Sequence, residues 1–415
     1  IPGSDLASVS TTQLAALGTA QVAALTTTQV DALTTNQLVS LGTSAVAAFT
    51  TTQLSALGTS DLNALGTTQF GALRTSQLAG LTTGQIANLE TTDLASLSTA
   101  QVRGFTTAQI DAMGTTQLAS LTSSQFGALT SGQVRGISTS DLSALGTTTL
   151  AGLTTAQVAA LTTAQVDGLT TNQMVALATN QVAAFNSAQL RALGTSDLDA
   201  FTTTQFAAFK TGQLAALTTT QVANLETSDL AALSTAQIRS FGTAAIDAMG
   251  TTQLASLTSA QFGALTSAQI RGLSTTDLAD LGTTTLSVMS TAQIAGLTTA
   301  QVDGLTTNQL VALGTSQVAA LNSAQLRSMG TSDLDSFTTT QFAAFKTGQL
   351  AALTTTQVAN LETSDLAALS TAQVRAFSSA GIDAMTTAQL SALTTTQFGA
   401  LTSGQMRAIG TTDLA

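Results

Sequence analysis

The chain has 415 residues, of which only 8% are charged, against roughly 25% in an average soluble domain. Its 11 basic and 22 acidic residues give a net charge of −11, which argues against nucleic-acid binding and against a polybasic membrane-surface site. It contains no His and no Cys, so the commonest general base, thiolate metal ligands, disulfides and a Cys nucleophile are excluded. The apolar runs are all far too short to cross a bilayer, and we therefore expect no membrane-spanning helix.

From Pro2 onward the sequence repeats every eight residues without a slip, roughly as Thr-Thr-x-Gln-Leu-x-Ala-Leu. Residues 162–169 are a clear example, and residues 2–409 hold 51 such octads. An unbroken short period is typical of a solenoid, in which each unit buries its apolar side chains against its neighbours. The sequence therefore predicts one continuous octad-repeat solenoid over residues 1–415.

Each position of the octad, counted from Pro2, has its own chemistry. Positions five and eight are apolar, position two is almost always Thr or Ser, and charges fall almost entirely at positions one, four and six. We therefore expect positions five and eight to point inward and positions one, four and six to reach solvent. Position four is neither Gln nor Asp in five octads, at Ala45, Thr149, Ala245, Thr285 and Gly381.

The spacing of the apolar positions favours helix over strand. Positions five and eight lie three apart, which places them on one face of a helix but on opposite faces of a strand. The string Leu-Thr-x-x-Gln-Val reads as a capping box with a hydrophobic staple. The N-cap is position one by the spacing to Gln, or position two by its near-constant Thr. At the octad junction, Gly is expected to end a helix in the left-handed conformation.

These features predict an all-α solenoid of very short helices, about two turns each, with one helix per octad. A β-solenoid built from Thr-rich strands is the alternative.

A second period of 17 octads lies over the first, and this 136-residue higher-order repeat occurs about three times. Three sets of residues follow this spacing, namely Glu90, Glu226 and Glu362; Arg103, Arg239 and Arg375; and Gln29, Gln165 and Gln301. Tandem duplication explains the spacing, and so does a geometric repeat in which 17 octads fill a whole number of superhelical turns. The sequence leaves both explanations open.

No constellation of residues points to catalysis. Ser and Thr abound, but no base stands ready to activate them, and Phe70, Phe126 and Phe206 occupy core positions. We predict no enzyme activity, no catalytic or cofactor-binding residue, no metal ligand and no cofactor.

Three acidic pairs are close in the sequence: Asp197 with Asp199, Asp333 with Asp335, and Asp277 with Asp280. Most such Asp residues are interpreted as surface charges or as partners of helix N-termini. A Ca²⁺ site is the weaker interpretation, because the Asp residues are diluted among Thr and Gln.

The run TTAQVAALTTAQ at residues 154–165 resembles the Thr/Ala-Gln-Leu repeats of very large secreted bacterial surface proteins, which are adhesin-like. The resemblance covers essentially the whole chain. It implies a secreted, extracellular protein of the bacterial cell surface that serves as a filament or fibre subunit or as an adhesin stalk. The alternative is a binding module for glycan, Ca²⁺ or ice on a repeat scaffold. We also expect end-to-end or lateral self-association, with possible glycan or surface contact.

Overall fold

The computed structural model describes residues 6–410, and this part of the chain holds 50 short helices, α2 to α51, and no strand. Every helix begins at position two of its octad and ends at position five, six or seven, as in α6 (Thr43–Val46), α4 (Thr27–Asp31) and α5 (Thr35–Ser40). The prediction of short helices with one per octad is confirmed, and the β-solenoid is wrong. At four to six residues the helices are somewhat shorter than the two turns expected.

The helices group into two compact units, Ile1–Gln213 and Leu214–Ala415, and each is described by itself. That the whole chain forms one continuous solenoid stays a prediction. The same local rules hold in both units.

Most helices start at a capping box whose N-cap is position one, whereas several without Gln at position four, such as α6 and α12 (Thr91–Ser96), have none. At α21 (Thr163–Asp167), the Thr162 N–H donates to Oε1 of Gln165 (2.9 Å), and the Gln165 N–H donates to Oγ1 of Thr162 (3.1 Å). Where position one is Gly, the Gln oxygen still caps the helix, as in the 2.8 Å bond from the Gly18 N–H to Gln21. The spacing to Gln therefore identified the N-cap, and the Thr of position two is the first helical residue.

The helices end without any left-handed residue. No residue in the described part of the chain, Gly included, has a positive φ, so the expected left-handed Gly is wrong. Junction glycines are instead extended N-caps, such as Gly42 with φ −69° and ψ 158°. The preceding residue at position eight is also extended, as at Leu41, and these two residues turn the chain into the next helix.

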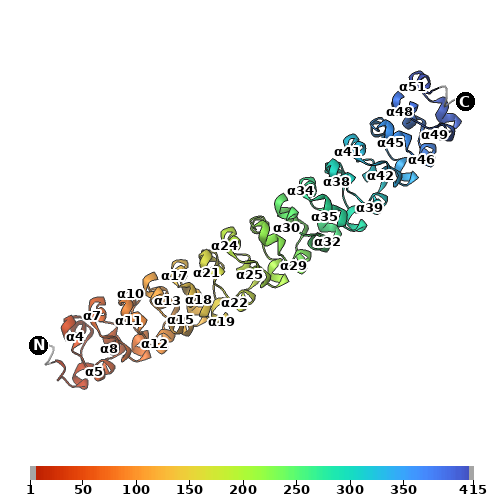
Figure 1. The fold of residues 1–415 in the computed structure, drawn as a ribbon. Coiled ribbons are helices and arrows are strands. Elements are labelled where there is room, and N and C mark those ends of the chain that lie inside the picture. Colours follow the sequence, from red (N-terminus) through yellow and green to blue (C-terminus); the bar gives the residue numbers. More distant parts are fainter. Residues whose placement is uncertain (1–5, 411–415) are drawn as a thin grey trace. The chain divides into compact units, whose positions relative to one another are not determined.

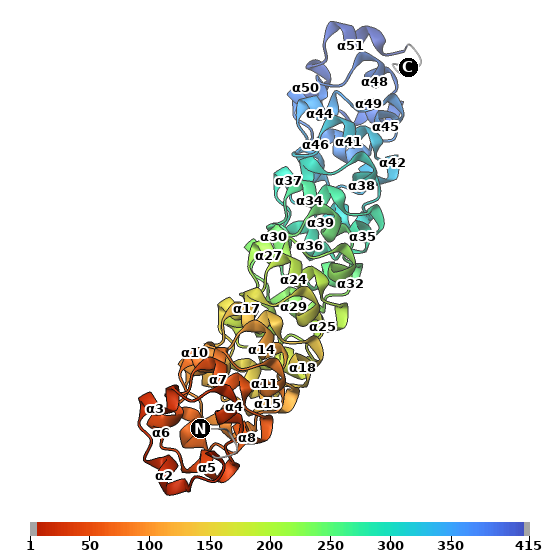
Figure 2. The ribbon, with the colours of Figure 1, turned by 90° about the vertical axis from the view of Figure 1, so that its left-hand side faces the viewer.

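The octads stack with between three and four per superhelical turn. Helices contact the third helix along the chain, as α14 (Thr107–Asp111) contacts α17 (Ser131–Gly136) in the first unit. In the second unit, α31 (Thr243–Asp247) contacts α34 (Ser267–Gly272). Side-chain bonds described below reach back into the fourth octad before, so one turn is longer than three octads and shorter than four. Figures 1 and 2 show the helices of each unit wound around a common interior.

The interior consists of positions five and eight. Away from the first and last described turns, both positions are buried in every octad. Phe70, Phe126 and Phe206 are completely buried, which confirms them as core residues. Phe206 also packs edge-on against Phe209, with ring centroids 5.3 Å apart. Burial of the two apolar side chains of each octad stabilises the fold by about 1.5–3 kcal/mol per side chain. The stability of the array therefore accumulates as octads stack on one another.

Candidate functional site

The Gln of position four is the side chain that joins successive turns. Its oxygen caps its own helix, and its Nε2 donates to carbonyls in the turn before. Gln165 Nε2 lies 3.0 Å from the Val134 oxygen, 3.4 Å from that of Arg135 and 2.8 Å from that of Ile137. One side chain therefore caps the start of its own helix and the end of α17, four octads earlier.

The same arrangement recurs in the second unit. Gln301 Nε2 lies 3.0 Å from the Ile270 oxygen and 2.8 Å from the Leu273 oxygen, and its Oε1 accepts from the Thr298 N–H at 2.9 Å. Gln165 and Gln301 are both buried. The expectation that position four reaches solvent is therefore wrong for the glutamines beyond the first described turn. These glutamines are buried because the amide lies against the carbonyls at the end of an earlier helix. It supplies the hydrogen-bond donors that those carbonyls otherwise lack.

Asp replaces Gln at position four in ten octads, two of which, with Asp5 and Asp413, lie outside the described residues. An ionised carboxylate accepts hydrogen bonds but donates none, so it cannot serve the carbonyls of the earlier turn. The described members are Asp61, Asp93, Asp141, Asp197, Asp229, Asp277, Asp333 and Asp365. In these octads, an ionised Asp therefore cannot make the hydrogen bond that Gln donates to the turn before.

Asp93, in α12 (Thr91–Ser96), is the most isolated of these carboxylates. Only 2% of its surface is exposed, and its Oδ2 atom has no hydrogen-bond partner in the described part of the chain. Asn63, which ends α8 (Thr59–Asn63) on the turn before, also holds a buried, unpartnered oxygen, Oδ1. Burial, and secondarily the Glu90 carboxylate, raises the pKa of Asp93 to about 6.

Asp365, within α46 (Thr363–Ala368), is the carboxylate at the equivalent position of the second unit. It is as buried as Asp93, and burial raises its pKa to about 6. The Glu362 carboxylate adds to this rise in pKa and that of Asp335 adds less, whereas a hydrogen bond from Thr339 opposes it. Asp229, which lies 17 octads before Asp365, is equally buried.

At Asp141, which occupies the same position of its octad, both carboxylate oxygens accept hydrogen bonds. The Ser138 hydroxyl, at position one, donates to Oδ2 of Asp141 at 2.6 Å, and the Thr115 hydroxyl from the turn before donates to Oδ1. Asp277 has the equivalent partners, with Ser274 at 2.6 Å and Thr251 at 3.1 Å. Before Asp93, Asp229 and Asp365, position one is Glu in place of Ser. The carboxylates of Glu90 and Glu362 repel those of Asp93 and Asp365.

The family model of the ALTTAQ repeat matches most of this sequence, octad after octad. The chain belongs to the ALTTAQ repeat family. The matches cover residues 3–35, 54–91, 86–123, 110–139, 135–171, 174–211, 191–227, 222–259, 247–275, 270–307, 327–363, 358–395 and 382–411. No curated protein matches the chain.

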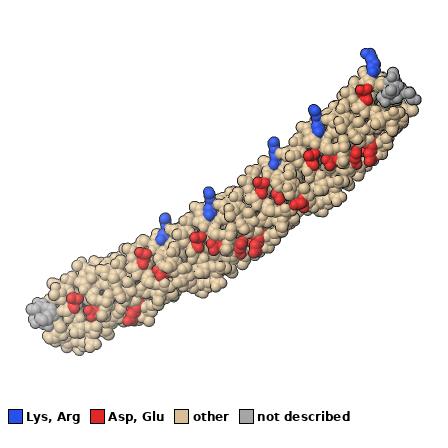
Figure 3. Space-filling model, in the orientation of Figure 1, with Lys and Arg blue, Asp and Glu red and all other residues tan. Residues whose placement is uncertain are grey.

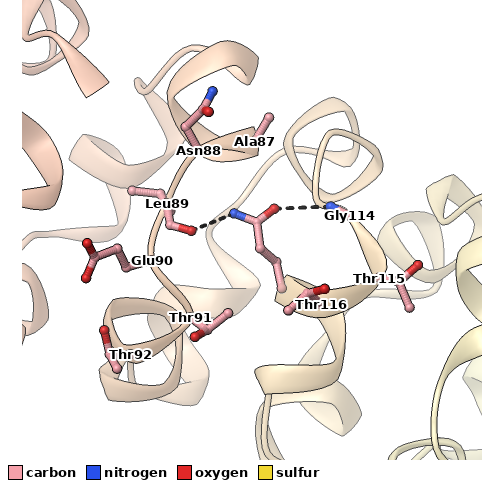
Figure 4. Close-up of a pocket in the computed structure, with 10 residues that line it drawn as sticks. Ala87, Asn88, Leu89, Glu90, Thr91, Thr92, Gly114, Thr115 and Thr116 are labelled. Carbon is pink, nitrogen blue, oxygen red and sulfur yellow. Dashed lines mark hydrogen bonds between the residues drawn. The ribbon is translucent and has the colours of Figure 1, made fainter. Parts of the chain in front are cut away.

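In this ALTTAQ repeat chain, a shallow groove lies beside Glu90. Gln117 lines this groove, with Nε2 donating to the Leu89 oxygen (2.8 Å) and Oε1 accepting from the Gly114 N–H (3.1 Å). Figure 4 draws both hydrogen bonds as dashed lines, ending at Leu89 and Gly114. The Glu90 carboxylate points away from this amide, and Thr91 contributes a hydroxyl. An equivalent groove lies beside Glu362. Polar grooves lined by hydroxyl groups thus lie beside the equivalent residues Glu90 and Glu362.

Charged side chains are sparse on the ALTTAQ surface. Figure 3 shows basic side chains standing singly and acidic ones in small groups along the visible face of each unit. Among residues 6–410, no three Asp or Glu side chains converge on a metal-sized site. Asp197 and Asp333 are partners of helix N-termini, as expected. They accept hydrogen bonds from the N–H groups of Gly194 and Gly330, respectively, at 3.1 Å.

None of the helices described in residues 6–410 has the length and apolar character that crossing a bilayer requires. The absence of enzyme activity stays a prediction. The hydroxyls that would be candidate nucleophiles bond locally, as Ser40 does to the Gln37 carbonyl at 2.7 Å.

The turn-to-turn role of position four was not predicted from the sequence. A readable signal existed, because no Glu, Lys or Arg ever occupies that position, although these residues are common on exposed helix surfaces.

Proposed function

We propose that this ALTTAQ repeat chain is a structural element, namely a filament or fibre subunit or an adhesin stalk of the bacterial cell surface. The observation that carries the proposal is the buried Gln of position four, which caps its own helix and the end of a helix in the turn before. Gln165 and Gln301 bond to carbonyls at equivalent positions in the two units. A chain that devotes most of its repeats to turn-to-turn bonding is suited to carrying load and setting distance.

The proposed mechanism is mechanical. Pulling two turns apart exposes the apolar residues of positions five and eight and breaks the Gln bonds between them. Each such bond contributes about 0.5–1.5 kcal/mol, and because most octads carry their own set, resistance is distributed over the whole array.

Self-association is part of the same proposal. With only 8% charged residues, two such chains repel each other weakly despite the net charge of −11, which favours lateral or end-to-end contact. An extracellular location fits a cysteine-free repeat protein of this kind and rests on the resemblance to secreted repeat proteins.

The alternative function is a binding module, and the groove beside Glu90, repeated beside Glu362, is the observation that favours it. Such a groove, lined by hydroxyl, amide and carboxylate groups, suits a glycan better than an apolar ligand.

Negative-stain electron microscopy of the purified full chain tests the structural function. Uniform polymers support a filament subunit, and single rods of constant width support a stalk. Compact globules, or particles without a constant width, would contradict both. Glycan-array binding that is lost in Glu90→Gln/Glu362→Gln would favour the binding module instead.

A further inference from the structure

Each unit contains a set of four exposed charges at position six of the octad, in the order minus, plus, minus, plus. The four residues of a set are 24, 32 and 24 residues apart, and we call each set a charge quartet. The first quartet consists of Asp111, Arg135, Asp167 and Arg191. The second quartet consists of Asp247, Arg271, Asp303 and Arg327.

The side chains of a quartet lie on successive turns of one stack of helices. In the first unit, α14, which ends at Asp111, packs against α17, which carries Arg135. Gln165 of α21 bonds to the Arg135 carbonyl at 3.4 Å. Helix α21 in turn packs against α24 (Ser187–Ala192), which carries Arg191. Because steps of three octads fall short of one turn and steps of four pass it, their offsets partly cancel, and the four charges stay on one side of the unit.

The second quartet is stacked in the same way. Helix α31, which ends at Asp247, packs against α34, which carries Arg271. Gln301 of α38 (Thr299–Asp303) bonds to the Arg271 carbonyl at 3.3 Å, and α38 packs against α41 (Ser323–Ser328). Each unit therefore presents its own column of alternating charges.

These eight charged groups are free to bind a partner. Among residues 6–410, none of the eight side chains forms an ion pair or a hydrogen bond, whereas the Arg74 guanidinium donates to the Ala47 carbonyl. Figure 3 shows basic side chains projecting singly from the visible face of each unit, with acidic side chains close by. Each of the eight is followed at position seven by Gly, Ala or Ser, so a second surface can approach closely.

We propose that the charge quartets form a lateral interface between two copies of this chain that run in opposite directions. The spacing of a quartet is the same when it is read from either end, but the signs are reversed. An antiparallel copy therefore places Arg191 opposite Asp111 and Asp167 opposite Arg135, and two-fold symmetry supplies the reciprocal pairs. This inference rests on the self-association proposed above and names the surface that makes it.

The alternation of sign favours a second copy over other charged partners. A polyanion that is attracted by the Arg residues of a quartet is repelled by its Asp residues. A parallel copy in register meets a like charge at every level, whereas an antiparallel copy meets the opposite charge. Because a single exposed ion pair contributes little, several pairs must act together, and the two units supply two quartets.

Sedimentation equilibrium of the full chain in about 50 mM salt, where surface charges are weakly screened, tests the interface with two variants of identical composition. The outer swap exchanges the first and last charges of each quartet, as Asp111→Arg/Arg191→Asp/Asp247→Arg/Arg327→Asp. The neighbour swap exchanges the first two charges, as Asp111→Arg/Arg135→Asp/Asp247→Arg/Arg271→Asp.

In an antiparallel pair, the outer swap keeps an opposite charge at every level, whereas the neighbour swap sets like charges against each other. We expect the outer swap to associate like the parent. We expect the neighbour swap to associate about 10-fold or more weakly, although both variants have the same net charge as the parent.

A neighbour swap that associates as strongly as the parent would overturn the proposal, and so would an outer swap that associates as weakly as the neighbour swap. Parent association that is unchanged in about 500 mM salt would also overturn it, because charge pairs are screened there. Should a swap variant not fold, this salt comparison decides, together with Arg135→Gln/Arg191→Gln/Arg271→Gln/Arg327→Gln, which is expected to associate more weakly than the parent. A parent that stays monomeric would overturn this inference alone, since single rods of constant width in electron micrographs would still support a stalk.

Discussion

Asp93 and Asp141 are the same residue at the same position of the octad, yet their surroundings differ. Asp141 receives hydroxyl hydrogen bonds from Ser138 on its own octad and Thr115 on the turn before. Asp93 follows Glu90 and keeps a buried oxygen without a partner in the described residues. In this pair of octads, the hydroxyl or carboxylate at position one decides whether Oδ2 of the Asp at position four has a hydrogen-bond partner.

Both octads differ from the majority, in which Gln at position four caps two helices at once. We therefore expect a hierarchy of turn contacts, with Gln strongest, a hydroxyl-partnered Asp intermediate and a Glu-preceded Asp weakest. Four substitutions test this order, from the largest expected effect to the smallest.

Gln165→Ala removes the amide from a Gln octad. It leaves the Thr162 N–H without its cap and the Val134 and Ile137 carbonyls without their donor. We expect the free energy of unfolding to fall by about 2–4 kcal/mol, measured by chemical denaturation. Gln21→Ala is the control, because Gln21 is exposed and caps Gly18, so its loss should cost about 1 kcal/mol or less. Equal losses would show that the contact between turns contributes little.

Thr82→Glu/Gln85→Asp rebuilds the Glu90–Asp93 arrangement in a Gln octad. We expect a loss of about 2–3 kcal/mol at pH 7.5, because a buried carboxylate replaces a donor and gains a charged neighbour. The loss should be smaller at pH 5.0. Thr82→Gln/Gln85→Asn, which carries no charge, is the control and should lose stability equally at both pH values; pH dependence in this control would contradict the explanation.

Ser138→Ala removes one of the two hydroxyls that donate to Asp141 and leaves the other, from Thr115. Both the cap of the Asp141 N–H (3.1 Å) and the bond to Oδ2 are lost, and we expect a cost of about 1–2 kcal/mol by thermal unfolding. Ser98→Ala is the matched variant, because Ser98 caps an octad whose position four is Gln101. The Ser98 hydroxyl also donates to the uncharged Oε1 of Gln101 (2.7 Å), so Ser98→Ala should cost less than losing the bond to a carboxylate, and equal losses would contradict the explanation.

Glu90→Ser is the reverse change and has the smallest expected effect. It removes the carboxylate that raises the pKa of Asp93 and offers the hydroxyl that Asp141 already has. We expect a gain of about 0.5–1 kcal/mol at pH 7.5 and a lowered pKa for Asp93, followed by ¹³C NMR. An unchanged pKa would show that burial alone sets it.

The local structure was predictable from the octad because its determinants lie within a single repeat. The three-residue spacing of apolar positions gave the helix, and the Thr–Gln spacing gave the capping box seen at Thr162 and Gln165. The apolar residues of positions five and eight are buried as expected.

The contacts between turns were not predictable, because they depend on how far the chain travels in one superhelical turn. That distance places the Gln165 amide against Val134, 31 residues away, and no local rule encodes it. The same contact supplies donors to helix ends, and for that reason Gly42 and the other junction glycines need no left-handed conformation.

Hydrogen–deuterium exchange by mass spectrometry on the full chain tests the hierarchy of turn contacts most directly. After correction for intrinsic rates, we expect peptides covering 90–97 and 362–369 to exchange faster than peptides covering 162–169 and 298–305 at pH 7.5. We expect this difference to shrink at pH 5.0. Uniform protection at both pH values would contradict the claim that Gln at position four holds the turns together and that buried Asp weakens them.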